Sequence, residues 1–352
     1  MNLIDKYKKV PVKEFPNEVL NKEILVSVCI PTYQQVDFIR ECLDSILKQQ
    51  TNFNFEILLG EDNSTDGTRE ICLEYAKIYQ DKIRLFLHSR ENNIRINGKP
   101  TGRFSFLNNF SEARGKYIAF CEGDDSWIDE FKLQKQVNFL IENSDHGLVF
   151  SSYKRFYEKK KIFEEVSFEN QKHLFTGNIF NSLILNNWIS TVSVMAKMDL
   201  LIQHADYVNY TDNEFPMADY PAWLDLSYHA KVGLIEEPMA MHRILPNSAS
   251  HSTVAKERVV FGEATYKIQK YFIEKYGVSA DIENQINLKI NKKRIRYAFF
   301  LNDKSLSNKA KNEIIELGSK LSFIEKIYYY SLKNKMVYFL FKKLFISFGV
   351  WI

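Results

Sequence analysis

The sequence predicts an α/β fold, in which a mostly parallel sheet is flanked by helices and followed by a helical C-terminal extension. Two observations lead to this prediction. Up to residue 121, short runs of apolar and β-branched residues alternate with segments whose apolar residues recur at helical spacing. Strands that alternate with helices in this way indicate βαβ units and parallel strands. After residue 253 the pattern becomes helical and rich in Lys and Arg.

The first predicted strand covers residues 24–30, an apolar run (ILVSVCI) that Pro31 closes. Such a continuous run is typical of a strand buried on both faces. A helix is expected over residues 36–49, where apolar residues share one face. The next elements are expected in this order: strand 55–59, helix 68–79, strand 83–87, helix 106–113 and strand 117–121. Further apolar runs, at 147–153, 187–195 and 233–235, are expected to extend the sheet.

The composition is that of an ordinary globular protein. Apolar residues make up 45% of the 352 residues, charged residues make up 26%, and the formal charge is +3. This charge gives no reason to expect a nucleic acid partner. The four cysteines form no Cys-x-x-Cys pair, which favours reduced thiols in a cytoplasmic protein over disulfides or zinc. We expect neither a secretory leader nor a spanning helix, because the first ten residues contain no apolar run and no stretch of about 18 apolar residues occurs.

Three segments are expected along the chain. Residues 1–23 form an N-terminal extension, residues 24–253 form the main α/β domain, and residues 254–352 form a helical region. The end of this last region is basic and aromatic.

Chemically distinctive residues follow three of the four strands predicted in the first half. Pro31-Thr32-Tyr33 follows the first strand, Glu61-Asp62 comes after the second, and Glu122-Gly123-Asp124-Asp125 follows the fourth. In open sheets of parallel strands, ligands bind beyond the carboxyl ends of the strands. These three segments are therefore the first place to look for a binding site.

The acidic run Glu122–Asp125 has two interpretations. Three carboxylates within four residues repel one another, which favours a bound cation that relieves the repulsion. Hard oxygen ligands of this kind suit Mg²⁺ or Mn²⁺, and substrate phosphates usually complete the coordination. Alternatively, the run is an acidic turn that caps the helix expected near Asp129. The run alone does not decide between the two.

The second acidic segment also combines structural and functional roles. Asp66 is well suited to cap the helix that follows, because Asp and Gly are common turn and cap residues. Glu61 and Asp62 are expected to face the crevice, where a carboxylate accepts hydrogen bonds from a nucleotide base.

These segments, in this order, resemble glycosyltransferase family 2. The resemblance covers residues 24–250 and rests on CIPTYQQVDFIRECLDSILKQ, FEILLGEDNSTDGTREI and GKYIAFCEGDDSWIDEFKLQKQVNFL. It implies an inverting enzyme with the Rossmann-like GT-A fold, so that residues 24–253 would be the catalytic domain. It also implies a role in building bacterial surface polysaccharides.

The resemblance assigns roles to particular residues. Pro31, Thr32, Tyr33, Glu61 and Asp62 fall on positions that hold the nucleoside in the family. The family's aspartate-x-aspartate motif, which binds the ribose and the diphosphate-bound metal, falls on Glu122-Gly123-Asp124, with Glu in place of the usual first Asp. Glu122 is then the ribose contact, Asp124 is the expected metal ligand, and Asp125 is a further candidate ligand.

The family also uses an acidic residue well downstream as general base, and Asp219 in Met217–Trp223 matches that place. A carboxylate on the face of the sugar opposite the leaving group accepts the proton of the attacking hydroxyl. The alternative is that Asp219 is a helix N-cap, since Pro221 and an apolar run follow it. Asp212 and Glu214 are fallback candidates.

Three more residues are candidates for phosphate or metal contact. Met241-His242-Arg243 resembles a family segment that closes over the diphosphate, so His242 is a candidate metal ligand and Arg243 a candidate phosphate partner. Arg103 is another phosphate candidate, although a solvated residue at a helix start is equally consistent with its position. A lone histidine is more often structural.

The C-terminal segment 323–352 has two interpretations. Its many aromatic residues accompany five lysines and a single acid, Glu325. One interpretation is an interfacial helix whose lysines face anionic lipid headgroups. The other is a helical cap or a dimer contact. The first favours a cytoplasmic protein that is peripheral on the inner face of the cell membrane.

The function expected from these features is transfer of one sugar from a nucleoside-diphosphate donor, most simply a UDP-sugar, to a hydroxyl of a glycan or lipid-linked acceptor. The enzyme would be a hexosyl- or N-acetylhexosaminyltransferase that uses Mn²⁺ or Mg²⁺. A nucleotidyltransferase is the alternative enzyme class, but it would carry a Gly-rich, basic loop where Pro31–Gln35 stands. A non-catalytic carbohydrate- or membrane-binding module is the third alternative.

Overall fold

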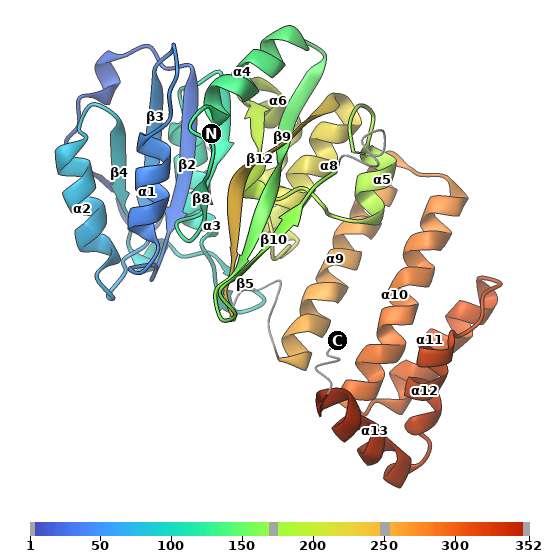
Figure 1. Ribbon diagram of the computed structural model, residues 1–352. Coiled ribbons are helices and arrows are strands. Elements are labelled where there is room, and N and C mark those ends of the chain that lie inside the picture. The colour runs from blue at the N-terminus through green and yellow to red at the C-terminus, as the bar shows by residue number, and fades with distance from the viewer. Residues whose placement is uncertain (1–3, 169–174, 247–253, 348–352) are drawn as a thin grey trace. The chain divides into compact units, whose positions relative to one another are not determined.

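The computed structural model describes residues 4–168, 175–246 and 254–347. The chain divides into two compact units, Met1–Arg243 and Ile244–Ile352 (Figure 1). The sequence predicted a division at 253/254, next to residues 247–253, which lie outside the described residues.

Four parallel strands form one half of the sheet in the first unit. They lie side by side in the order β4 (Ile83–Leu87), β3 (Phe55–Glu61), β2 (Val26–Thr32) and β7 (Tyr117–Phe120). The side chains of β2 and β3 are almost all buried, as expected for strands covered on both faces. The predicted parallel α/β core is confirmed, with strand ends within two residues of the expected positions.

The order of these strands creates a switch point between β2 and β7. The chain steps outward from β2 to β3 and β4, and then returns to β7 on the other side of β2. The helices α1 (Ile39–Leu47) and α2 (Thr68–Ile78) make the outward steps, and α3 (Arg103–Glu112) makes the return. Because such crossovers are right-handed, outward and return helices cover opposite faces. Figure 1 shows α1 and α2 together in front of these strands.

A glycine lets α3 approach the sheet closely. A Cβ atom on Gly60 would lie 2.2 Å from the Ser105 hydroxyl oxygen and 2.8 Å from Oδ1 of Asn109. In its absence, Ser105 donates a hydrogen bond to the Gly60 carbonyl and Asn109 donates one to the Leu58 carbonyl. The return helix is therefore held against β3 by side chains that reach the strand backbone.

The other half of the sheet is antiparallel at its junction with the first. The strand β11 (Met195–Lys197) pairs antiparallel with β7 and with β9 (His146–Tyr157). Beyond β9 lie β12 (Lys231–Ile244) and β8 (Ser126–Trp127), while β10 (Ile162–Val166) pairs with β9 and β1 (Lys13–Glu14) pairs with β4. The apolar runs at 147–153 and 233–235 do extend the sheet, but of 187–195 only Met195 lies in a strand.

Shorter elements complete the first unit. They are the two-stranded pair β5 (Arg95–Ile96) and β6 (Lys99–Pro100) and the helices α4 (Lys132–Glu142), α5 (Phe180–Leu185), α6 (Met198–His204), α7 (Tyr207–Asp212) and α8 (Asp219–His229). All four cysteines are buried thiols in this unit.

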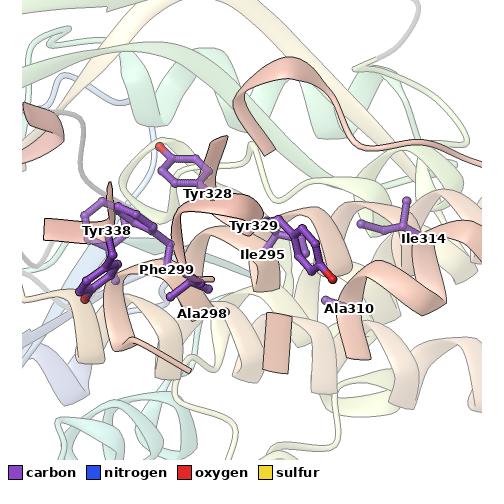
Figure 2. Close-up of a cluster of buried hydrophobic side chains, with 10 residues drawn as sticks. Ile295, Ala298, Phe299, Ala310, Ile314, Tyr328, Tyr329 and Tyr338 are labelled. Atoms are coloured by element: carbon purple, nitrogen blue, oxygen red, sulfur yellow. The ribbon is translucent and has the colours of Figure 1, made fainter. Parts of the chain in front are cut away.

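The second unit is helical, as predicted. It contains α9 (Ala255–Tyr276), α10 (Ala280–Leu301), α11 (Lys304–Glu316), α12 (Phe323–Ser331) and α13 (Lys335–Ser347). Its core gathers buried residues from α10 to α13, and Figure 2 shows the rings of Phe299, Tyr328 and Tyr338 within it. None of the helices in the described part of the chain is both long and apolar enough to cross a membrane.

One buried histidine makes stability sensitive to acid. His88 follows β4, is 2% exposed, and has no hydrogen-bond partner for either ring nitrogen within the described residues. Its ring meets Phe104 edge to face. Burial, with a smaller contribution from Arg69, lowers the pKa of His88 to about 4.

Replacing His88 with Leu should therefore flatten the acid dependence of stability. The unfolded histidine titrates near 6.5, so between pH 6.5 and 4 protons bind the unfolded chain preferentially and the wild-type protein loses up to about 3 kcal/mol. Urea unfolding across this pH range measures the difference. His204→Leu, on α6, serves as control and should leave the acid-dependent loss in place. An equal loss in His88→Leu and wild type would contradict the assignment.

Candidate active site

The acidic run after β7 lies directly on the end of β2. The backbone N–H of Gly123 donates to the Pro31 carbonyl at 3.3 Å. A Cβ atom on Gly123 would lie 2.4 Å from Oε1 of Gln35 and 2.7 Å from Oγ1 of Thr32. Only glycine fits this close approach. The structure therefore brings Pro31 and Thr32 together with Glu122–Asp125 at the switch point of the sheet.

Asp124 has the property expected of a cation ligand. Its Oδ1 atom is buried and has no hydrogen-bond partner among the described residues. Burial raises the pKa of Asp124, and only the nearby Arg243 and the residue's own backbone oppose this shift. Burying a carboxylate oxygen that makes no hydrogen bond raises the free energy of the folded protein, unless a cation or a hydrogen-bond donor binds that oxygen.

Glu122 connects the acidic turn to Asp219. The Glu122 side chain is in contact with solvent, but the protein around it removes part of its hydration. This partial loss of water, together with repulsion from Asp124 and Asp219, raises the pKa of Glu122 to about 8. The carboxylate of Asp219 is therefore close enough to act on Glu122 electrostatically.

Asp219 is the first residue of α8 rather than its N-cap. The N-cap is Ala218, and no side chain caps this helix. The Asp219 carboxylate instead accepts a hydrogen bond from the Thr191 hydroxyl at 2.7 Å. The fallback candidates have other partners: Asp212 pairs with Lys6 at 2.6 Å, and Glu214 accepts the Asn97 N–H at 3.2 Å. Asp219 is the one of these three carboxylates whose charge acts on Glu122.

Asp125 is turned toward the strand β12. It is 6% exposed, and its Oδ1 atom accepts the backbone N–H of Arg243 at 2.7 Å. Burial, followed by repulsion from Asp124 and Glu122, raises the pKa of Asp125 well above its usual range. In this position Asp125 anchors the acidic turn to β12, and its role as a metal ligand stays a prediction.

Arg243 binds acidic side chains and the acidic turn itself. Its guanidinium donates to Glu41 at 2.6 Å, to Glu158 at 2.7 Å and to the carbonyl of Asp124 at 2.9 Å. It also lies 4.8 Å from the centre of the Phe38 ring. With its three nitrogens engaged in this way, Arg243 acts in the structure as a clamp between α1, the residue that follows β9, and the acidic turn. Its contact with phosphate stays a prediction.

His242 and Arg103 lie in different surroundings. His242 is half-buried on β12, with its Nδ1 atom 3.4 Å from the Ser190 hydroxyl. Arg103 is buried at the start of α3 and donates to the Thr211 hydroxyl and the Phe215 carbonyl. Burial lowers the pKa of Arg103 to about 10. Both predicted contacts, with metal and with phosphate, stay predictions.

On the side of β2 where β3 lies, the site is built around Asp62. The residue is buried, and its Oδ2 atom accepts hydrogen bonds from Arg90 and Asn93, while Oδ1 has no partner among the described residues. Burial raises the pKa of Asp62 to about 6. The Arg90 guanidinium lies over the Tyr33 ring, with its Cζ atom 4.1 Å from the ring centre. Tyr33 is 42% exposed.

Sequence reasoning did not select Arg90 or Asn93. The available signal was their place in the polar, Asn-rich segment after the third strand. Sequence reasoning did select Glu61. The two carboxylate oxygens of Glu61 accept hydrogen bonds from the Ser64 N–H and from Arg69, each at 2.5 Å. Glu61 shapes the loop after β3, and its predicted contact with the nucleoside is not tested.

The residues that the structure describes do not form a complete metal site by themselves. Within residues 4–168, 175–246 and 254–347, no three carboxylate, imidazole or thiol side chains converge closely enough to hold an ion. Mg²⁺ and Mn²⁺ sites commonly take one or two carboxylates from the protein and the rest of their ligands from phosphate and water. The Asp124 oxygen that has no hydrogen-bond partner among the described residues suits an ion of that kind.

Fold and site together define a class: an α/β protein that gathers acidic residues at the switch point of a parallel sheet. Residues 27–196 match the family model described as Glycosyl transferase family 2. This segment of the chain belongs to that family, as the resemblance indicated.

The chain is also similar to known proteins and to solved structures. An uncharacterised protein of Mycobacterium tuberculosis is 30% identical over 236 residues, which cover 66% of this chain and 62% of that protein. The chain thus spans less than two thirds of that relative. TuaG of Bacillus subtilis, which is named as a teichuronic acid biosynthesis glycosyltransferase, is 36% identical over 124 residues, or 35% of this chain and 45% of TuaG.

Two solved structures show the same fold at 14% identity. One is S. aureus TarS 1–349 in complex with UDP-GlcNAc, with a TM-score of 0.50 over 89% of this chain and 92% of that one. The other is the mannosyltransferase PcManGT from Pyrobaculum calidifontis in complex with GDP-Man and Mn²⁺, with a TM-score of 0.52 over 92% and 83%. The predicted GT-A fold is confirmed.

Replacing Arg243 with Met tests whether this residue is a clamp. The variant should lose about 2–3 kcal/mol of unfolding free energy, because Glu41, Glu158 and the Asp124 carbonyl lose a buried donor. Urea unfolding measures this loss, with Arg155→Met on β9 as control. Unchanged stability together with weaker UDP binding would instead favour the phosphate contact.

Proposed function

We propose that this protein is a metal-dependent inverting glycosyltransferase that moves one sugar from a nucleoside-diphosphate donor to an acceptor hydroxyl. One observation carries the proposal. The acidic turn on the end of β2 carries a buried Asp124 oxygen that has no hydrogen-bond partner among the described residues, and the charge of Asp219 reaches the neighbouring Glu122. A cation ligand and a general base in one site are what such a transfer requires.

Asp124 is the residue that would hold the metal. When held there, Mn²⁺ or Mg²⁺ would supply Lewis-acid stabilisation of the charge that develops on the leaving diphosphate. The structure of PcManGT in complex with GDP-Man and Mn²⁺ supports this choice of metal. Asp125, whose carboxylate is bound to the Arg243 N–H, contributes by fixing the turn that carries Asp124.

The nucleoside would lie against Asp62 and Tyr33. Above pH 6 the Asp62 carboxylate is mostly ionised and only accepts hydrogen bonds, so its free Oδ1 atom suits a base with an N–H on its edge. Uracil has such an N–H, and the complex of TarS with UDP-GlcNAc supports a UDP-sugar donor. The exposed Tyr33 ring, held from one side by Arg90, offers a flat surface for the base.

Asp219 is the proposed general base. It accepts the proton of the acceptor hydroxyl as that oxygen attacks the sugar from the face opposite the diphosphate, which inverts the configuration. The hydrogen bond from Thr191 orients the carboxylate for this role. Glu122 is the proposed ribose contact.

The proposed acceptor is a glycan or a lipid-linked molecule in surface polysaccharide synthesis, and the sugar is a hexose or N-acetylhexosamine. Similarity to TuaG, named for teichuronic acid biosynthesis, supports the pathway class. The proposed location is cytoplasmic, on the inner face of the cell membrane.

Replacing Asp124 with Asn should remove the metal dependence of nucleotide binding. In calorimetry with UDP, Mn²⁺ should strengthen binding to the wild-type protein about tenfold or more, because Asp124 would hold a cation that offsets the charge of the diphosphate. In the variant this gain should disappear. Glu130→Gln, an exposed carboxylate on the same segment, is the matched control. An Mn²⁺ gain that survives in Asp124→Asn would refute the metal assignment.

Replacing Asp219 with Asn should separate chemistry from donor binding. UDP affinity should stay within about twofold of wild type, while sugar transfer falls roughly 10²–10⁴-fold, the usual contribution of a general base. Asp212→Asn is the control, since Asp212 pairs with Lys6 and should not affect transfer. Transfer rates would be followed as UDP release with an acceptor present. Full activity in Asp219→Asn would assign the base elsewhere.

A further inference from the structure

The helix α13 has one buried face and one exposed face. On the buried face, Tyr338 is 4% exposed, and Phe341 and Phe345 pack against the core of the second unit. The ring of Phe345 lies 5.0 Å from that of Tyr328, and Lys342 donates to the carbonyl of Phe300. These contacts fix which side of the helix turns outward.

The outward face is apolar. Met336 is 80% exposed, Leu340 67%, Phe339 58% and Leu344 43%. Their spacing of three and four residues puts them in one stripe along the helix. Four large apolar side chains in one stripe are more than scattered surface residues and indicate an interaction surface.

The charged residues of α13 are all basic. Lys335 and Lys343 are exposed on α13, and the whole chain contains no acidic residue after Glu325. Glu325 itself closes the capping box at the start of α12, where its side chain accepts the N–H of Ser322. The nearest acid in sequence is therefore bound to its own helix and does not neutralise the lysines of α13.

We propose that the outward face of α13 docks on a membrane surface rich in anionic phospholipid. Met336, Phe339, Leu340 and Leu344 would enter the boundary between headgroups and acyl chains, and Lys335 and Lys343 would reach the phosphates around them. Apolar burial and attraction to anionic lipid then act together. The helix lies in the membrane surface, which agrees with the absence of a spanning helix in the described part of the chain.

A second copy of this chain is a poorer occupant of the same face. In a two-fold symmetric dimer the same patch meets itself, so Lys335 and Lys343 of one copy would approach the same lysines of the other. With no acid on α13 to pair with them, this arrangement brings like charges together. An anionic lipid surface complements the patch instead.

Sedimentation with vesicles tests the proposal on the full-length protein. Wild type should bind vesicles of mixed phosphatidylglycerol and phosphatidylcholine, bind pure phosphatidylcholine much less, and be released by salt. The double variant Phe339→Asp/Leu340→Asp should bind more than about tenfold more weakly. Lys335→Gln/Lys343→Gln should lose about fivefold for each lysine. The matched control is Ile141→Asp/Ile202→Asp, which changes two exposed isoleucines of the first unit and should bind as wild type.

Three results would overturn the proposal. The first is vesicle binding by Phe339→Asp/Leu340→Asp equal to that of wild type, and the second is no binding by wild type. The third is a wild-type dimer in lipid-free solution that this variant dissociates, which would assign the face to a second copy. Because vesicle binding is measured without donor or metal, its outcome is independent of the proposed transferase activity. Circular dichroism of each variant confirms that the exposed substitutions leave the helices folded.

Discussion

The arrangement of the candidate site depends on Arg243. Its backbone N–H binds Asp125, and its guanidinium binds the Asp124 carbonyl, Glu41 on α1 and Glu158 beyond β9. One residue of β12 thus holds the acidic turn from both its backbone and its side chain. Without such a clamp, a turn that carries three carboxylates would tend to open, since like charges separate when nothing holds them. The antiparallel half of the sheet thereby fixes the acidic turn at the edge of the parallel half.

Two buried carboxylate oxygens without a hydrogen-bond partner in the described residues are the second feature that defines the site. Asp62 and Asp124 each keep one buried oxygen without a partner in the described residues, on either side of the end of β2. Most buried polar groups in proteins are hydrogen-bonded, so two such oxygens near one strand end indicate groups that await a ligand. In the proposed function, a donor nucleotide with its metal would offer an N–H to Asp62 and a cation to Asp124.

In the second unit, the two faces of the helix α13 lie in different environments. The aromatic side of α13 completes a core with Phe299 and Tyr328, while Met336 and Leu340 face outward. Both sets of residues are apolar, so hydrophobicity alone does not distinguish them. Packing against α10 and α12 decides which set is buried, and the lysines then give the outward set a positive border.

The sequence by itself determined the parallel strands, their connecting helices and the segments that meet at the site, because apolar periodicity and turn residues are local signals. It also singled out Asp124 and Asp219, through their order along the chain. Tertiary structure decided how individual side chains are used: Arg243 binds two glutamates, and Arg90 joins Asp62. These pairs lie 28 to 202 residues apart in the chain. Such partners are chosen by how the strands and helices pack, and no local pattern records that choice.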